Sequence, residues 1–161
     1  MPLIKSISGI RGTIGGRPGE NLTPLDIVKF SAAYGTWIKT VNKSKEKCTV
    51  VIGRDGRMSG AMVKSLVMST LTALGIDVID TDFSTTPTVE MAVVFLKADG
   101  GIILTASHNP KEWNALKLLN SRGEFISADD GSRILELAEK EHFSFSDVEA
   151  LGTVVVDQTT I

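Results

Sequence analysis

Short apolar stretches alternate along this chain with longer segments whose apolar residues recur every three or four positions. Residues 49–52, 76–79 and 101–104 are short and apolar and adjoin glycines, which is typical of buried strands. After residue 23, Ile27, Phe30 and Tyr34 fall on one face of a helix. This alternation predicts an α/β fold. Because helices separate the strands, at least part of the sheet must be parallel.

Local signals mark where the predicted helices begin. Four residues of the kind that caps a helix stand at such positions: Thr23, Ser59, Thr86 and Ser127. Proline follows both threonines, at the first helical position, where its missing N–H is tolerated. We therefore predict four helices, each beginning directly after one of these residues.

The remaining segments are assigned to strands and loops. Residues 3–7 are expected to form a strand, and the glycine-rich residues 9–19 a loop. Residues 115–119 and 124–126 are expected to pair as a hairpin around Asn-Ser-Arg-Gly. Residues 153–156 fit either one more strand or an exit from the domain.

Composition limits the kinds of partner. The 161 residues suit a single domain, and 17 basic against 19 acidic residues leave a formal net charge of −2. This balance argues against nucleic acid as a partner, and the lack of an apolar run of about 18 residues argues against a membrane. Cys48 is the only cysteine, and the first residues lack the apolar core of a secretory signal, so we expect a cytoplasmic location.

The segment at residues 105–110, Thr-Ala-Ser-His-Asn-Pro, directly follows the strand predicted at 101–104. Ligands of α/β sheets bind beyond the carboxyl ends of parallel strands, so chemistry is expected here. The proline keeps Asn109 extended, and Ser107 would then be presented on a stiff, exposed turn. The alternative is a polar loop whose side chains only satisfy backbone groups.

A serine-hydrolase site is poorly supported. Ser107 does not lie in a Gly-x-Ser-x-Gly elbow. His108 is adjacent to it in sequence, and the other histidine, His142, lies near the end of the last predicted helix.

Three arginines are candidates for binding an anion, and one lysine is a candidate for proton transfer. Arg11 lies in a glycine-rich stretch that could approach an anion closely or form a simple turn. Arg54 and Arg57 follow the strand at 49–52, where they could contact phosphate or pair with nearby acids. Lys117 lies on a predicted strand, where a lysine is usually solvated but can exchange protons when other cations lie close.

Taken together and in this order, these segments resemble the α-D-phosphohexomutase family, which includes phosphoglucomutases, phosphomannomutases and phosphoglucosamine mutases. The matching segments are Ser-Gly-Ile-Arg-Gly at 8–12, Gly-Arg-Asp-Gly-Arg at 53–57, Pro-Thr at 87–88 and Thr-Ala-Ser-His-Asn-Pro at 105–110. Asn114 and Lys117 continue the last segment at the family's spacing. The resemblance covers residues 1–143 and implies the N-terminal domain of a four-domain enzyme, with a three-layer αβα fold. Residues 144–161 would lead toward domains outside this chain.

The resemblance implies a phosphoserine mechanism. Ser107 would carry a phosphoryl group, give it to a hexose phosphate and take back the other phosphate of the hexose 1,6-bisphosphate intermediate. A magnesium ion would bind Ser107 through its phosphate, with its other ligands outside this chain. The expected partners are a phosphorylated hexose and the remaining domains, and the isolated chain is expected to be inactive.

Roles for the other residues also follow from the resemblance. Arg11 would stabilise the phosphoryl group in transfer, and Lys117 would act as general acid or base. His108 and Asn109 would orient the serine loop, and Arg54 would bind substrate.

The sequence departs from the family pattern at Ala115, where glycine is usual, and at Gly56, where threonine is common. Neither position is assigned to chemistry. A non-catalytic module that binds phosphorylated sugars or a protein is the alternative function. Within the family, glucosamine or mannose phosphate is the favoured substrate.

Overall fold

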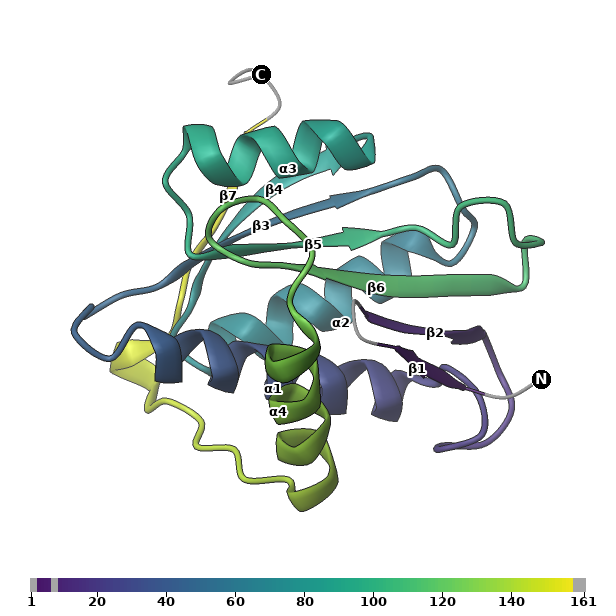
Figure 1. The fold of residues 1–161 in the computed structure, drawn as a ribbon, viewed down its shortest axis with the longest axis horizontal. Helices are drawn as coiled ribbons and strands as arrows, with labels where there is room; N and C mark the ends of the chain where they lie inside the picture. Colours follow the sequence, from purple (N-terminus) through teal and green to yellow (C-terminus); the bar gives the residue numbers. More distant parts are fainter. Residues whose placement is uncertain (1–2, 7–8, 158–161) are drawn as a thin grey trace.

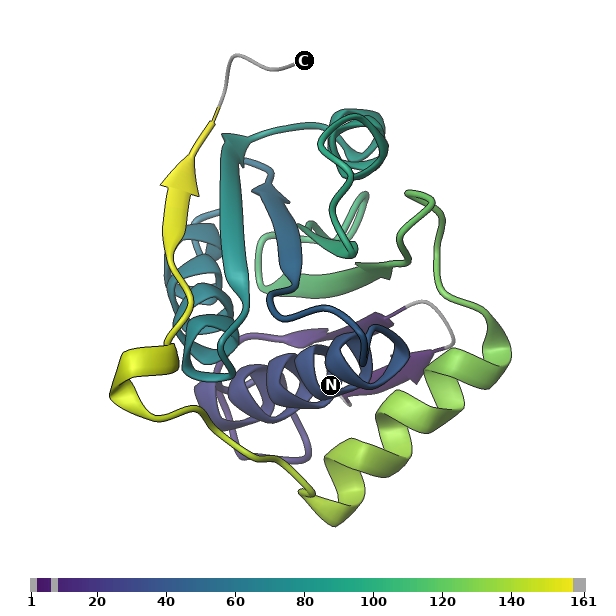
Figure 2. The ribbon, with the colours of Figure 1, turned by 90° about the vertical axis from the view of Figure 1, so that its left-hand side faces the viewer.

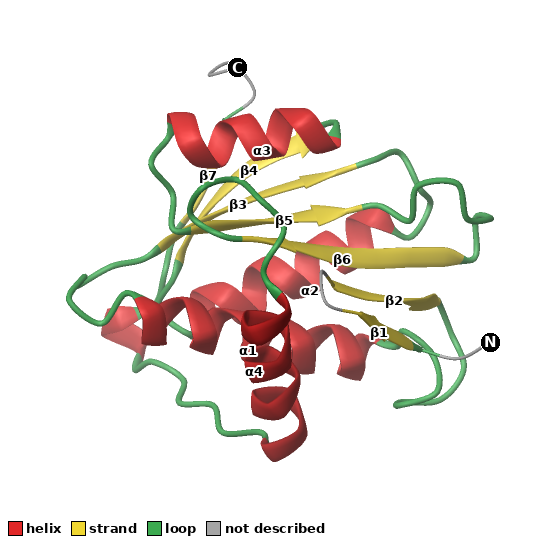
Figure 3. Cartoon of the chain, in the orientation of Figure 1, coloured by secondary structure: helices red, strands yellow, loops and turns green. Residues whose placement is uncertain are grey.

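The computed structural model describes residues 3–6 and 9–157. This part of the chain forms one mixed sheet with strand order β1-β2-β6-β5-β3-β4-β7 (Figures 1 and 3). The strands are β1 (Ile4–Ser6), β2 (Gly9–Thr13), β3 (Thr49–Arg54), β4 (Asp77–Phe83), β5 (Gly100–Leu104), β6 (Trp113–Leu119) and β7 (Val154–Val156). The helices are α1 (Pro24–Val41), α2 (Gly60–Ala73), α3 (Thr86–Phe95), α4 (Ala128–Lys140) and the short 3₁₀ helix η1 (Val148–Ala150).

The sheet is partly parallel, as predicted. Strand β3 pairs in parallel with both β4 and β5, and β4 pairs in parallel with β7. Strand β6 runs antiparallel to β5 and to β2, and β1 is antiparallel to β2. The carboxyl ends of β3, β4 and β5 therefore meet at one edge of the sheet.

Helices cover both faces of the sheet, which gives three layers. Helices α1, α2 and α4 lie on one face and α3 on the other (Figures 1 and 2). Successive residues of the central strands enter opposite cores, so Ile52 and Ile102 pack toward α1 and α2 while Val51 and Ile103 pack toward α3. Burial on both faces explains why β3 and β5 are continuously apolar in sequence. The predicted α/β fold with three layers is confirmed.

Helix starts follow the local signals closely, with one shift. The side chains of Thr23 and Ser127 accept the backbone N–H three residues on, as predicted. Helix α3 begins one residue earlier than predicted, because Thr85 caps it and Thr86 is its first residue. Ser59 precedes α2, but its hydroxyl makes no capping bond and instead accepts a hydrogen bond from Asn114 Nδ2 at 2.8 Å.

Near the sheet's antiparallel side one prediction was wrong and another is confirmed only in part. Residues 9–13 of the predicted glycine-rich loop form β2, and Gly9 is needed there because any side chain would overlap the Leu116 carbonyl of β6. Residues 124–126 form no strand of their own, but they turn back onto the end of β6. An antiparallel bridge joins Leu119 to Phe125, and Ile126 N donates to Leu118 O at 3.2 Å. Over the rest of its length β6 pairs with β2 and β5.

The end of the described chain joins the same sheet. Ser146 N donates to Ala73 O at 2.8 Å and Gly152 N to Thr72 O at 2.9 Å, which fixes the segment against the end of α2. Residues 154–156 then form β7, so the first of the two interpretations of this stretch is confirmed. None of the helices in the described ranges combines the length and the apolar character that crossing a bilayer requires.

The capping box of α1 gives a stability prediction. Thr23 Oγ1 accepts from Asp26 N, and the Asp26 carboxylate accepts from Thr23 N at 3.0 Å, with both residues buried. We expect Thr23→Ala to lower the free energy of unfolding by about 1–2 kcal/mol. The change removes the hydroxyl that accepts from Asp26 N and that also donates to the buried Asp26 carboxylate. Thr40→Ala, near the exposed end of the same helix, is the control, and urea unfolding is the measurement. Equal loss in the two variants would contradict the role assigned to the cap.

Candidate active site

The candidate site lies at the carboxyl ends of β3 and β5, where the arrowheads point toward the right-hand side of Figure 1. The loop at residues 105–112 leaves β5, and the loop at 55–59 leaves β3 beside it. Strand β6 brings Lys117 to this edge, opposite Ile103 of β5. Strand β2 brings Arg11, opposite Ala115 of β6.

Ser107 occupies an unusual backbone conformation. Its φ is +54°, in the left-handed region that few residues other than glycine adopt, and its side chain is exposed. Such a conformation persists only where the surroundings hold it. Ser107 N donates to Thr105 Oγ1 at 3.2 Å, and Ser107 Oγ accepts from Lys117 Nζ at 2.6 Å. The structure thus brings together the serine and the lysine that the sequence had singled out.

Arg57 holds this loop by its main chain. Its Nη2 donates to the carbonyl oxygens of Ser107 and Asn109, each at 2.9 Å. Its Nη1 donates to the carbonyl oxygens of Pro110 at 2.8 Å and Trp113 at 3.1 Å. The side chain is 11% exposed, and its Nε donates to Asp55 Oδ2 at 3.3 Å. All five N–H groups of the side chain therefore have a partner in the protein.

Asp55 and Thr105 complete the support. Thr105 Oγ1 donates to Asp55 Oδ2 at 2.6 Å while it accepts the N–H of Ser107. Asp55 N donates to Leu104 O at 3.1 Å, which ties the β3 loop to the end of β5. The serine is therefore bracketed on its amino side by Thr105 and on its carbonyl side by Arg57.

Arg11 reaches the same loop through Asn109. Arg11 Nη1 donates to Asn109 Oδ1 at 3.4 Å, and the guanidinium lies 5.7 Å from the centre of the Trp113 ring. His108 is exposed and makes no hydrogen bond to another described residue. Ser8, the first residue of the matching Ser-Gly-Ile-Arg-Gly segment, lies outside the described residues.

Arg54 points toward β4. Its Nε lies 3.5 Å from Asp82 Oδ1, and its guanidinium stacks 4.2 Å from the centre of the Phe83 ring. Hydrogen bonding from Lys64, with a further contribution from Arg54, lowers the pKa of Asp82. Arg54 lines a separate hollow of about 540 Å³ with Thr85 at the start of α3. It shares the edge with Ser107 but does not contact it.

The two departures from the family pattern are accommodated locally. Ala115 is buried in β6, and its N–H donates to Asn114 Oδ1 at 2.8 Å. Gly56 is exposed, its φ is not positive, and a Cβ there would meet nothing within 4 Å, so a threonine would also fit.

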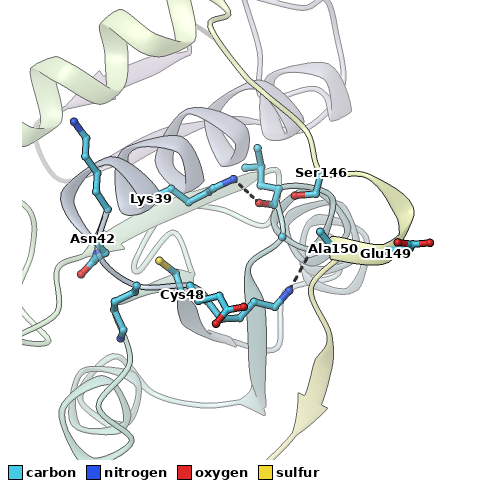
Figure 4. Close-up of a pocket in the computed structure, with 12 residues that line it drawn as sticks. Lys39, Asn42, Cys48, Ser146, Glu149 and Ala150 are labelled. Atoms are coloured by element: carbon cyan, nitrogen blue, oxygen red, sulfur yellow. Dashed lines mark hydrogen bonds between the residues drawn. The ribbon is translucent and has the colours of Figure 1, made fainter.

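A second hollow, of about 720 Å³, lies at the opposite edge of the sheet (Figure 4). Three of its lysines bind the chain itself: Lys39 Nζ donates to Leu74 O at 2.9 Å, Lys45 Nζ to Asp99 Oδ1 at 2.7 Å and Lys47 Nζ to Ala150 O at 3.3 Å. Burial raises the pKa of the Cys48 thiol, which keeps it in its unreactive protonated form. The residues that line this hollow hold the segment around Ala150 in place, and they bring no reactive groups together.

Sequence reasoning left the function of Arg57 open between phosphate binding and pairing with an acid. The structure shows the pairing with Asp55 and adds the loop carbonyls, which no local pattern indicated. The one available signal was its position as the second arginine after a strand that adjoins β5.

This is an αβα domain with an exposed serine, a lysine and an arginine at the carboxyl edge of its parallel strands. The family described as phosphoglucomutase/phosphomannomutase, alpha/beta/alpha domain I, matches residues 3–145. The chain belongs to this family and corresponds to its domain I.

Individual relatives agree with this assignment. The chain is 40% identical over 134 residues to a phosphoglucomutase/phosphomannomutase of Thermococcus kodakarensis, covering 82% of this chain and 29% of the relative. It is 34% identical over 149 residues to a phosphoglucosamine mutase of Helicobacter pylori, covering 89% and 33%. A crystal structure of a phosphoglucomutase/phosphomannomutase family protein from Burkholderia thailandensis superposes with a TM-score of 0.77 at 25% identity, covering 97% of this chain and 33% of that one. The chain spans about a third of the length of these relatives.

Proposed function

We propose that this domain supplies the phosphoserine of an enzyme that moves phosphate between C1 and C6 of a hexose, with Ser107 as the carrier. The observation that carries the proposal is the contact of 2.6 Å between Lys117 Nζ and Ser107 Oγ. It occurs on an exposed turn whose backbone is held from both sides. The serine side chain on such a turn is open to a substrate, and the main chain that carries it is fixed in place.

The chemistry needs positioning and positive charge more than covalent help from the protein. In the first transfer, the bond between phosphorus and Ser107 Oγ breaks while a sugar hydroxyl forms a new bond to phosphorus, and Lys117 takes the hydroxyl proton. In the second transfer, Ser107 Oγ forms a bond to the phosphorus of the other phosphate while the bond from that phosphorus to the sugar oxygen breaks, and Lys117 returns the proton to this oxygen. A phosphoserine carries roughly −1.5 to −2 charges, which Arg11 would partly offset, and Lys117 adds positive charge once it holds the proton. His108 and Asn109 are proposed to orient the loop and the phosphate.

Magnesium remains part of the proposal. Among the residues that the structure describes, no group of three or more His, Cys, Asp or Glu side chains could hold a metal ion. Asp55, the carboxylate that contacts the serine loop, is already bound by Thr105 and Arg57. A magnesium ion at this site would therefore bind the phosphate of Ser107, neutralise part of its charge, and need its other ligands from elsewhere in the full-length protein.

The substrate is proposed from the same family. The relatives named as phosphoglucosamine mutase and as phosphoglucomutase/phosphomannomutase support a hexose phosphate, with glucosamine or mannose phosphate favoured. Arg54, which lines a hollow at the same edge, is proposed to contact this substrate. The remaining domains of the full-length protein would supply the rest of the site, and a cytoplasmic location accords with the free thiol of Cys48.

Phosphate labelling tests the proposal. The full-length protein is incubated with glucose 1,6-bisphosphate labelled with ³²P, digested and mapped, and isomerisation of glucose, mannose and glucosamine 1-phosphates is assayed in parallel. We expect one labelled phosphate on the peptide that contains Ser107, and turnover of at least one sugar phosphate. A protein that neither becomes labelled nor isomerises any of the three substrates would instead be the non-catalytic module.

A further inference from the structure

We infer that Arg57 is the positioning residue that holds Ser107 in its left-handed conformation and so keeps the serine hydroxyl on Lys117. This inference rests on the proposed function of Ser107. Arg57 comes from the loop after β3, whereas the serine lies fifty residues later, after β5. Its guanidinium is nearly buried behind the loop, and each of its N–H groups already has a protein acceptor. A phosphate could bind Arg57 only by displacing the loop that carries the serine.

The carbonyl oxygens that accept from Arg57 show which part of the chain it holds in place. The four carbonyl oxygens belong to Ser107, Asn109, Pro110 and Trp113, so they span the chain from the serine to the start of β6. A left-handed residue other than glycine reverts to a commoner conformation unless its neighbours prevent it. With Thr105 on the N–H of Ser107 and Arg57 on its carbonyl, both peptide groups around the serine are held.

The contacts from Arg57 to this loop involve main-chain atoms only. Adding or removing a phosphate on the Ser107 side chain therefore leaves every one of these bonds in place. The same backbone frame serves the serine as phosphate donor and as phosphate acceptor. Arg57 should consequently affect the rate of transfer in both half-reactions and have little effect on the binding of the sugar phosphate.

Lysine cannot replace arginine in this role. The guanidinium presents five N–H groups in a planar fork, which here spans two pairs of carbonyls and a carboxylate. An ammonium group presents three N–H groups from one point and cannot reach both ends of the loop. Arg57→Lys keeps the charge and removes the frame, so it separates positioning from electrostatics.

The test is a double-mutant cycle in the full-length protein with Arg57→Lys and Lys117→Met. We expect Arg57→Lys to lower kcat by about 10²-fold, the size of effect that a misplacement of about 1 Å can have, and to change KM for the sugar phosphate by less than about threefold. Lys117→Met is expected to lower kcat by about 10³-fold. Because Arg57 acts by placing Ser107 on Lys117, the double variant should lose about 10³-fold, and not the roughly 10⁵-fold of independent effects. Arg122→Lys, an exposed arginine paired with Glu124, is the control and should retain wild-type kinetics.

Three outcomes overturn the inference: wild-type kcat in Arg57→Lys, additive losses of kcat in the double variant, or a loss of kcat/KM in Arg57→Lys that comes mainly from a higher KM. If Arg57→Lys does not fold, Arg57→Gln replaces it in the same cycle, since its shorter side chain ends in two N–H donors in place of five. Full kcat or additive behaviour in that variant is equally decisive. Failure of the proposed function is distinguishable, because it would appear as full turnover in Ser107→Ala whatever Arg57 does.

Discussion

Ser107→Ala is expected to remove mutase turnover from the full-length protein, with a loss on the order of 10⁵-fold or more in kcat. The reason is that no other described hydroxyl occupies this position. Ser107 Oγ is the hydroxyl that Lys117 contacts, and the neighbouring hydroxyl of Thr105 is engaged by Asp55 and the backbone. Without Ser107 the phosphoryl group has no covalent carrier. The positive charges of Lys117 and Arg11 could still attract a phosphate but could not form the bond that stores it between the two transfers. Isomerisation of hexose 1-phosphate is the measurement.

Folding should be unaffected by this change, which makes the result interpretable. The Ser107 side chain is exposed, and its hydroxyl bonds only to Lys117, so we expect the free energy of unfolding to change by less than about 0.5 kcal/mol. Ser121→Ala, an exposed serine of the turn after β6, is the matched control and should leave turnover unchanged. Wild-type turnover in Ser107→Ala would remove the serine from the mechanism.

Local signals in the sequence predicted the parts of the fold that depend on local physics. The pairing of Thr23 with Pro24 predicted the start of α1, because a capping side chain and a proline act within one turn of helix. The apolar residues 101–104 predicted β5, and the position of the next segment placed Ser107 at the carboxyl edge of the sheet. The serine and Lys117 could be proposed as partners because the segments carrying them also resemble a known family.

Features that depend on distant partners could not be predicted in the same way. Gly9 and Gly12 indicate flexibility when read alone, yet both lie in β2. A Cβ on Gly9 would overlap the Leu116 carbonyl of β6, and one on Gly12 would crowd Leu22 and Leu3. The expected hairpin forms only at its turn, because β2 pairs with residues 113–117 of β6 and leaves only the last residues of this strand to pair with 124–126. Pairing of strands far apart in sequence is decided by the whole sheet and not by the turn between two segments.

Arg57 shows the same limit within the site. Its sequence context, an arginine two residues after an aspartate, is explained equally well by a surface ion pair. Only the three-dimensional arrangement shows that the guanidinium faces four carbonyls of a loop fifty residues away. The reactive hydroxyl was therefore accessible to sequence reasoning, whereas the support that fixes its geometry was not.

Lys117→Met is expected to lower kcat by about 10³-fold and to alter the shape of the pH–rate profile, because the variant retains the length of the side chain but cannot accept or donate a proton. The lysine is half-buried on β6, and its neighbours on the same strand, Leu116 and Leu118, pack into the core. Its Nζ is therefore delivered to Ser107 by a rigid strand. Steady-state rates across the pH range at saturating sugar phosphate are the measurement, with Lys111→Met, an exposed lysine of the serine loop, as the control.

Lys117→Arg distinguishes proton transfer from simple charge. Arginine retains the positive charge near Ser107 but does not release its proton in the accessible pH range, so it cannot act as a base. If Lys117 moves the proton of the sugar hydroxyl, Lys117→Arg should be nearly as slow as Lys117→Met. If the arginine variant recovers most of the rate, the contribution of Lys117 is electrostatic, and the proton must pass to another group. An unchanged profile with undiminished kcat in Lys117→Met would exclude both roles and leave the contact of 2.6 Å with Ser107 without a part in the chemistry.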